Sequence, residues 1–299
     1  MTLPVVFHES YEVDIGPHVF PTTKYRLVRD RLLEEETIRG DQTHRPEPAT
    51  DEEVLLVHTP GYVRKIRTGA FTVEEEALLE VPFSPALGKA SWLSAGGSIL
   101  AGRLALSRGA AVHLGGGFHH AFPDHGEGFC LIHDVAIAIR TLRGEGRIRR
   151  AAVVDLDVHH GNGTAAIFAD DPEVFTFSMH QQNNYPAWKP GSDLDVGLAD
   201  GAADEEYLGL LERHLPDILE RHHPDLVYYV AGADPYEFDQ LGGLGLTLAG
   251  LRRRNEVVFE HCRREGVSVA AVLAGGYASR IEDTVEIHCG MVRAAAKLV

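Results

Sequence analysis

Three side chains that can bind a metal ion stand two residues apart in the segment VVDLDVH (residues 153–159). Asp155, Asp157 and His159 alternate with apolar residues, and in an extended strand residues two apart point to the same side. Two carboxylates and an imidazole on one side are costly to desolvate unless a cation joins them. The spacing therefore predicts a metal site, with a hydrogen-bonded polar strand end as the alternative.

The third protein ligand of this metal is expected from a different loop. A catalytic zinc ion takes three protein ligands and leaves a fourth position open. Asp157 and His159 supply two, and the best candidate for the third is Asp234 in AGAD (residues 231–234), where Gly232 lets the backbone pass close to the metal. Asp155 is then expected behind the ligands, orienting a histidine or helping to bind a monovalent cation.

Two tandem histidines, His119 and His120, follow the glycine-rich segment GGGF (residues 115–118). Histidine suits proton transfer near neutral pH, and a nearby carboxylate fixes which ring nitrogen carries the proton. A flexible approach can bring both rings near a metal-activated water. A second tandem pair contains His160, which we expect to be structural because it faces away from its neighbour.

These residues must be positioned by a parallel sheet with crossover helices, because short apolar runs alternate with longer helical patterns. The predicted strands are residues 5–7, 110–114, 151–156, 174–179, 226–231 and 267–273. The predicted helices are residues 89–107, 135–143, 203–221, 248–265 and 282–297. Thr50 and Glu53 predict a capping box for a short helix running into Val57, and residues 40–49 are expected to form a loop.

Four of these strands lead directly into GGGFHH, DVHHGNG, GADPYEFD and AGGY. Ligands of open parallel sheets bind outside the carboxyl ends of the strands, so the four loops should converge on one site.

Composition limits the possible classes of protein. The 299 residues are 44% hydrophobic, which fits one α/β domain spanning residues 1–299. We expect a cytoplasmic protein, since no apolar membrane segment or signal peptide is evident. The sequence leaves the oligomeric state open, and a monomer is the default. The net charge of −16 argues against nucleic-acid partners. It is compatible with cationic substrates such as lysine side chains or polyamines, although acidity also simply favours solubility.

The motifs GGGFHHA, GEGFCLIHD, DLDVHHGNGT, GADPYEFDQLGG and LAGGY occur in this order. Together they resemble the histone deacetylase superfamily, which includes acetylpolyamine amidohydrolases and acetoin-utilisation proteins. The resemblance runs from Val57 to Tyr277, and the segments VRKIRTG, SPA, GNG and GGL look most like the class IV branch. It implies the arginase/deacetylase fold, a three-layer αβα domain with a mostly parallel central sheet.

The resemblance also implies roles for individual residues. Asp157, His159 and Asp234 match the zinc ligands, and His119 with His120 match the catalytic histidine pair. Tyr277 matches the tyrosine at the oxyanion, and Phe129, Tyr185 and Gly128 match positions along the acyl channel. Asp155 matches the carboxylate behind the first histidine. It also matches a ligand of a potassium site, together with Ser178 and the backbone carbonyls of Asp155, Asp157, His159 and Met179.

Two departures from the family pattern affect these roles. Asn162 stands where class I members have an aspartate behind the second histidine, so His120 lacks a charged support and is expected to have a lower pKa. Tyr185 replaces the commoner phenylalanine, and the surrounding residues 181–193 align least well.

The resemblance implies zinc-dependent hydrolysis of the amide of an N-acyl amine, acyl-lysine above all, through a metal-activated water. Acetylpolyamines or other small amides are the first alternative, and two carboxylates with one histidine also accept Fe²⁺ or Co²⁺. A binuclear manganese ureohydrolase is disfavoured because DxDxHH and DPY lack its second metal motif. A noncatalytic acyl-ligand or metal-binding protein would not need the histidine pair and Tyr277.

Overall fold

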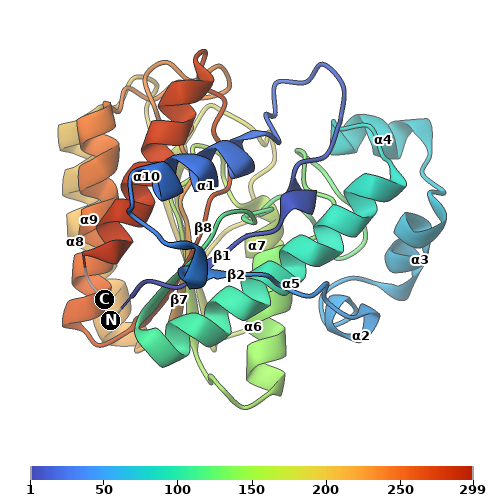
Figure 1. Ribbon diagram of the computed structural model, residues 1–299, viewed down its shortest axis with the longest axis horizontal. Helices are drawn as coiled ribbons and strands as arrows, with labels where there is room; N and C mark the ends of the chain where they lie inside the picture. The colour runs from blue at the N-terminus through green and yellow to red at the C-terminus, as the bar shows by residue number, and fades with distance from the viewer. Residues whose placement is uncertain (1, 298–299) are drawn as a thin grey trace.

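The computed structural model describes residues 2–297 and contains an eight-stranded sheet with the strand order β2-β1-β3-β8-β7-β4-β5-β6 (Figure 1). Every neighbouring pair is parallel. The strands are β1 (Val5–Val6), β2 (Thr43–His44), β3 (Ala110–His113), β4 (Ala151–Asp155), β5 (Val174–Gln181), β6 (Leu194–Leu198), β7 (Leu226–Val230) and β8 (Ser268–Val272).

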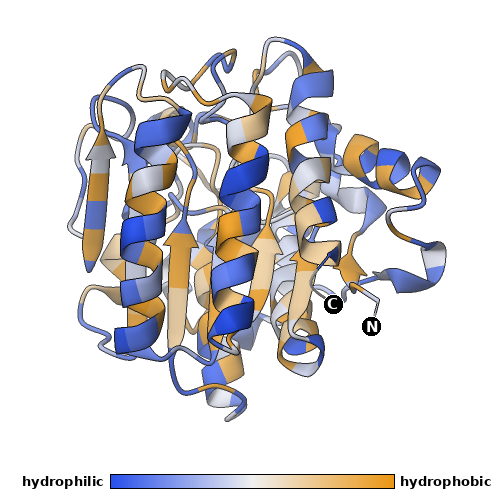
Figure 2. Ribbon diagram, turned by 90° about the vertical axis from the view of Figure 1, so that its left-hand side faces the viewer, coloured by the Kyte–Doolittle hydropathy of each residue, from blue (hydrophilic) through white to orange (hydrophobic). Residues whose placement is uncertain are grey.

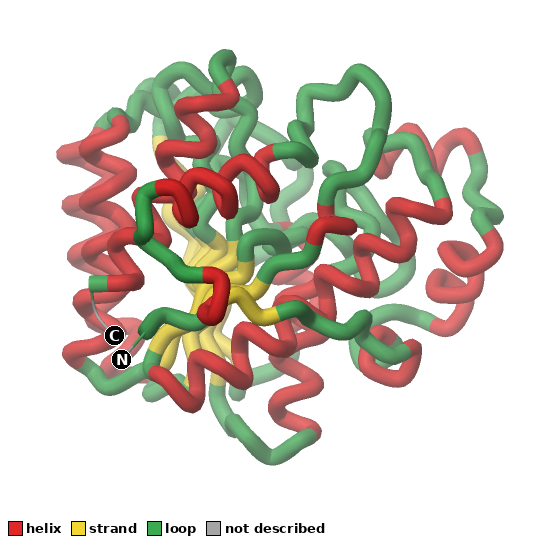
Figure 3. The backbone as a smooth tube through the Cα atoms, in the orientation of Figure 1, coloured by secondary structure: helices red, strands yellow, loops and turns green. Residues whose placement is uncertain are grey.

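Helices cover both faces of this sheet. One face carries α5 (Pro85–Arg108) and α6 (Asp134–Gly144), which pack on each other. The other carries α8 (Asp204–His222), α9 (Leu248–Arg264) and α10 (Ile281–Ala296), with α1 (Lys24–Glu34) packed on α10. Figure 2 shows helices lying in front of the strands, and Figure 3 shows the strands between two groups of helices. The predicted three-layer αβα architecture is confirmed.

Four shorter α-helices and two 3-10 helices complete the described fold. The α-helices are α2 (Asp51–Val54), α3 (Pro60–Thr68), α4 (Val73–Leu79) and α7 (Asn162–Phe168), and the 3-10 helices are η1 (Glu9–Tyr11) and η2 (Gly40–Gln42). Thr50 and Glu53 form the predicted capping box at the start of α2. The helix ends at Val54, before the predicted Val57, and the amides of Leu56 and Val57 then bond to the carbonyls three residues back, those of Glu53 and Val54.

All six predicted strands are present, with ends within two residues of the prediction. Two further strands carry no strong sequence signal. The two-residue β2 is polar and lies inside residues 40–49, so the prediction of a loop there is wrong at Thr43–His44, which pairs with β1. The edge strand β6 alternates half-buried and exposed residues, and it pairs with β5.

The centre of the sheet is dry, since every residue of β3, β4 and β7 is buried. Parallel strands covered on both faces need such continuous apolar runs. The carboxyl ends of these strands therefore form a rigid base for the loops that follow them.

Among the helices of residues 2–297, none has the length and apolar character that a membrane span requires.

Candidate metal centre and active site

The segment after β4 places its acidic residues by hydrogen bonds to its own backbone. The alternation of Asp155, Asp157 and His159 does not reflect one extended strand, because β4 ends at Asp155. Asp155 Oδ1 accepts the amide of Asp157 at 3.2 Å, and Asp157 Oδ1 accepts the amide of His159 at 3.0 Å. Side chains that bond to the backbone two residues ahead favour turns over strands. The three side chains still come together, although by a turn.

Asp157, His159 and Asp234 converge at the carboxyl ends of β4 and β7, as predicted. Nδ1 of His159 lies 3.0 Å from Asp157 Oδ1 and 3.4 Å from Asp234 Oδ2. Asp234 Oδ1 accepts the amide of Val158 at 2.9 Å, which fixes the carboxylate. Its Oδ2 is buried without a hydrogen-bond partner among the described residues. This orphaned oxygen, with Asp157 and His159, offers one ligand atom from each residue to a metal ion.

Two glycines make room for the carboxylates. A Cβ on Gly232 would collide with Asp157 Oδ2 and come close to Asp234 Oδ1. A Cβ on Gly275, after β8, would collide with Asp234 Oδ2, and the Gly275 amide donates to Asp157 Oδ2 at 2.9 Å. The predicted close approach at Gly232 is present, and Gly275 provides the same clearance from a third strand.

The electrostatics of this group favour a cation. Burial opposes a charge on His159, but the neighbouring carboxylates of Asp157 and Asp234 raise its pKa to about 10. Burial and the neighbouring charge of Asp157 raise the pKa of Asp234 to about 7. Excess negative charge in a low-dielectric site is neutralised by a proton or by a metal ion. Two carboxylates and one imidazole fit a divalent ion such as zinc.

The tandem histidines lie beside this group and have different supports. Nδ1 of His119 donates to Asp155 Oδ2 at 2.7 Å, whereas Nδ1 of His120 donates to Asn162 Oδ1 at 2.7 Å. Although burial opposes it, Asp155 and Asp157 raise the pKa of His119 to about 9. Burial lowers the pKa of His120 well below its ordinary value, and His119 lowers it further. The pair thus combines one positively charged ring with one neutral ring.

Glu127 supplies a carboxylate behind Asn162. The Asn162 amide nitrogen donates to Glu127 Oε1, and the Tyr185 hydroxyl donates to the same oxygen at 3.0 Å. Burial raises the pKa of Glu127, but hydrogen bonds from His125, Asn162 and Tyr185 outweigh it and hold the pKa below its usual value. The sequence analysis missed this residue, although it stands two positions before Phe129 in GEGF.

Buried polar residues missed by the sequence analysis hold the loop that carries the histidines. The Asp134 carboxylate accepts the amide of Phe118 at 2.8 Å and that of Gly117 at 3.1 Å. Ser98 on α5 donates its hydroxyl to the same carboxylate. Gly117 has a φ of +88°, a conformation that favours glycine. A signal existed in HD (residues 133–134), which opens α6 with an acidic residue in its first turn.

Tyr277 is also positioned by residues distant in sequence. Its backbone amide donates to Asp239 Oδ2 at 2.7 Å. The buried Lys24 ammonium lies 5.6 Å from the Tyr277 ring and donates to the carbonyl of Ala274 at 2.6 Å. Burial lowers the pKa of Lys24 to about 8, against the raising effect of Asp234 and other acids. No motif or spacing in the sequence distinguishes Lys24 from the other charged residues of α1.

A pocket of about 350 Å³ leads to these groups. The predicted channel residues Gly128, Phe129 and Tyr185 line it, together with His120, His159 and Tyr277. The Phe129 ring lies 5.8 Å from the Tyr277 ring, and the Tyr185 ring lies 4.9 Å from the His120 ring. Five further lining residues were not predicted as site residues: His18, Val19, Glu80, Asn184 and Leu241.

The proposed potassium ligands are adjacent, since Asp155 and Ser178 face each other in the register of β4 and β5. The Ser178 hydroxyl is 3.0 Å from Nδ1 of His180. A potassium site at Asp155 and Ser178 stays a prediction.

Comparison with known proteins agrees with this geometry. The family model for the histone deacetylase domain matches residues 18–292. The chain belongs to the histone deacetylase family. An uncharacterized protein of Picosynechococcus is 44% identical over 99% of both chains. Histone deacetylase 2 of Arabidopsis thaliana is 31% identical, over 94% of this chain and 77% of its own.

The fold of this family member matches a solved relative. The crystal structure of the HDA15 HD domain superposes with a TM-score of 0.80 at 24% identity, covering 97% of this chain and 89% of that one. This confirms the predicted deacetylase fold. Membership of the histone deacetylase family supports a deacetylase or amidohydrolase activity.

Proposed function

We propose that the protein is a zinc-dependent deacylase that hydrolyses the amide of an N-acyl amine, with acyl-lysine as the substrate class. The observation that carries this proposal is the meeting of Asp157, His159 and Asp234 beside the neutral His120, in a pocket with aromatic walls. The cytoplasmic location, the monomeric state and the single domain of residues 1–299 stay predictions.

Asp157, His159 and Asp234 would hold the zinc ion. When bound, zinc polarises the acyl carbonyl and lowers the pKa of a water molecule from 15.7 toward about 7. The Val158 and Gly275 amides, which donate to Asp234 and Asp157, keep the carboxylates in place. A fixed ligand set of this kind costs little reorganisation during the reaction.

His120 would move the proton. Its Nδ1 donates to Asn162, so the lone pair lies on Nε2. That nitrogen can accept a proton from the attacking water and later deliver it to the leaving amine. Glu127 behind Asn162 keeps the amide oriented with its oxygen toward His120, and this hydrogen-bonded chain supplies a charged support one residue further away.

His119 and Tyr277 would stabilise the transition state. His119 is held in its positively charged form by Asp155, and it lies in ring contact with His120, with centroids 4.1 Å apart. Tyr277 lines the pocket with its hydroxyl protonated, because burial raises its pKa well above the ordinary value. A hydroxyl donor aimed at the acyl oxygen acts most strongly when that oxygen becomes negative.

The mouth of the pocket favours a cationic or lysine-containing substrate. Glu80 lines the same pocket as the aromatic Phe129 and Tyr185. Burial raises the pKa of Glu80, and Glu127 raises it further. An acidic side chain at this position also fits acylated polyamines, which carry positive charge beyond the amide. We therefore retain acetylpolyamines as the second substrate class for the same reaction.

A fluorogenic acyl-lysine assay tests this function. Acetyl-lysine and longer acyl-lysine peptides should be hydrolysed, and a hydroxamate should inhibit. His120→Ala should abolish turnover, while His261→Ala on α9, far from the pocket, should retain it. Unchanged turnover in His120→Ala, or no hydrolysis of acyl-lysine or acetylpolyamine by the zinc-loaded protein, would refute the proposal.

A further inference from the structure

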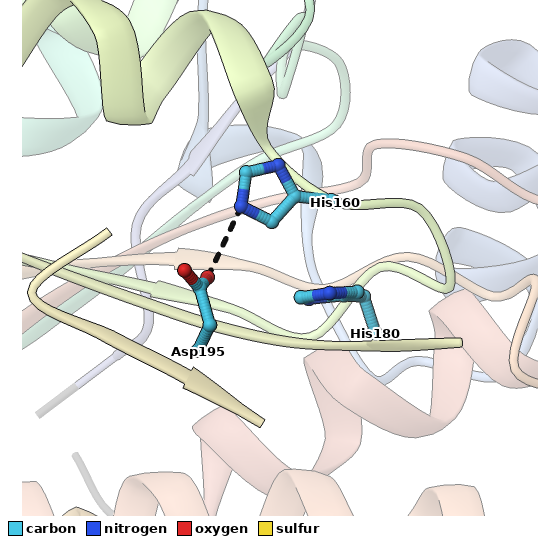
Figure 4. A group of neighbouring side chains, drawn as sticks. All are labelled: His160, His180 and Asp195. Atoms are coloured by element: carbon cyan, nitrogen blue, oxygen red, sulfur yellow. Dashed lines mark hydrogen bonds and ion pairs between the residues drawn. The ribbon is translucent and has the colours of Figure 1, made fainter. Parts of the chain in front are cut away.

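A second cluster of metal-binding side chains lies at the edge of the sheet, apart from the catalytic residues. It consists of His160, His180 and Asp195 (Figure 4). Their possible ligand atoms lie within 4.8 Å of one another. We propose that this cluster, called here the edge site, binds a second divalent transition-metal ion of the zinc type.

The three residues come from three segments that the sheet brings together. His160 follows β4, His180 lies on β5 and Asp195 lies on the edge strand β6. Nε2 of His160 is 3.1 Å from Asp195 Oδ1, and the two imidazole rings have centroids 4.7 Å apart. In Figure 4 the His180 ring extends toward the space between His160 and Asp195. Ligands of tetrahedral zinc lie about 3.3 Å apart for bonds of about 2.0–2.1 Å, so modest side-chain movement suffices.

His180 has a free nitrogen that suits a ligand. Its Nδ1 is 3.0 Å from the Ser178 hydroxyl, whereas no hydrogen bond from the described residues reaches its Nε2. When Nδ1 donates to the Ser178 hydroxyl, the lone pair lies on Nε2, which is the arrangement of known metal-binding histidines. His180 is only 2% exposed, so this free nitrogen is held in place.

Asp195 is also oriented for this role. Its Oδ2 accepts the amide of Ser192 at 2.9 Å, and its Oδ1 faces His160. The side chain is 31% exposed, which gives an ion access from solvent and leaves a coordination position for water. Two imidazoles and one carboxylate with an open position favour zinc, cobalt or nickel over calcium or magnesium.

A metal ion at the edge site would connect the loop that lines the pocket to the sheet. Asp195 and Ser192 close the loop 182–193, which carries Tyr185 on the pocket wall. His160 is adjacent in sequence to the candidate catalytic ligand His159. An ion bound at the edge site therefore fastens the base of this loop to β5 and to the segment after β4.

Counting bound ions tests the edge site without relying on catalysis. Full-length protein is dialysed to equilibrium against a buffered concentration of free Zn²⁺, and zinc per chain is measured by elemental analysis. The wild type should bind one more zinc ion than Asp195→Asn or His180→Gln. The exposed acid Asp217 provides the control, since Asp217→Asn should bind as much zinc as the wild type.

Two further variants separate this proposal from the catalytic one. Asp157→Asn should lose the catalytic ion and retain the edge ion, and Asp157→Asn with Asp195→Asn should lose both. A loss in Asp195→Asn alone would support the edge site even if the catalytic proposal failed. Equal zinc in the wild type, Asp195→Asn and His180→Gln, with all three folded by circular dichroism, would overturn it.

Discussion

Replacing Asn162 with aspartate should place two carboxylates in contact, because the Asn162 amide nitrogen donates to Glu127 Oε1. Two carboxyl groups that share a buried site cannot both ionise, so one must keep a proton. If its pKa rises from about 4.5 to about 7, the folded state loses about 3.0 kcal/mol at pH 7 and about 3.4 kcal/mol well above pH 7, from about 1.36 kcal/mol for each unit.

The sign of this effect gives it a characteristic pH dependence. A carboxyl group whose pKa is higher in the folded state binds its proton more tightly there. The penalty is therefore small below about pH 4.5, grows as the pH rises and levels off above about pH 7. Urea unfolding of Asn162→Asp at pH 5 and pH 7.5 should show the larger loss at pH 7.5.

The double variant Asn162→Asp with Glu127→Gln is the matched control. It keeps one carboxylate and one amide in exchanged positions, so most of the lost free energy of unfolding should return. The carboxylate would now contact His120 directly and raise the pKa of that ring. The acidic limb of kcat/KM should then move to higher pH than in the wild type. An equal loss at both pH values, with no recovery in the double variant, would refute the role assigned to Glu127.

Three other predictions follow from the site. Tyr277→Phe should reduce kcat by about 10²–10³ if the hydroxyl acts like other oxyanion donors, and its unfolding by urea should match that of the wild type. A loss of kcat below threefold on an acyl-lysine peptide would contradict this role. Because the pKa of His120 lies below 6.5 and the base must be neutral, kcat/KM should stay level down to about pH 6.5. An acidic limb of the pH profile above pH 7 that disappears in a His120 variant would contradict this assignment. Dialysis against a chelator should abolish hydrolysis and lower the melting temperature. Zinc at a hundredfold excess over its Kd should restore about 2.7 kcal/mol of stability. Full activity of the metal-free protein would exclude the metal mechanism.

The parts of the fold that were predicted share a strong local signal. Buried strands such as β4 and β7 are continuous apolar runs, and α8 and α9 have regular apolar spacing. The polar two-residue β2 and the half-exposed β6 lack that signal, because their stability comes from pairing with β1 and β5. Strand propensity depends on such tertiary context.

The residues of the candidate site also fall into a group that was predicted and a group that was missed. The predicted ligands and histidines follow strands in compact motifs, so a parallel sheet brings them together. Glu127, Asp134 and Lys24 act through contacts with residues distant in sequence, including Lys24 with the carbonyl of Ala274. A single charged residue in a sequence gives no indication that it is buried, and its partner is known only from the fold. The supports of the site were therefore missed, while the three residues proposed as metal ligands were predicted to lie together.

The central claim is that one ion is bound between Asp157, His159 and Asp234. Anomalous diffraction from crystals of zinc-loaded protein, measured on both sides of the zinc absorption edge, tests it most directly. The account predicts a peak at about 2.0–2.2 Å from one atom of each of these residues. Three side chains turned apart with no peak between them, or two ions bridged at this position, would contradict it.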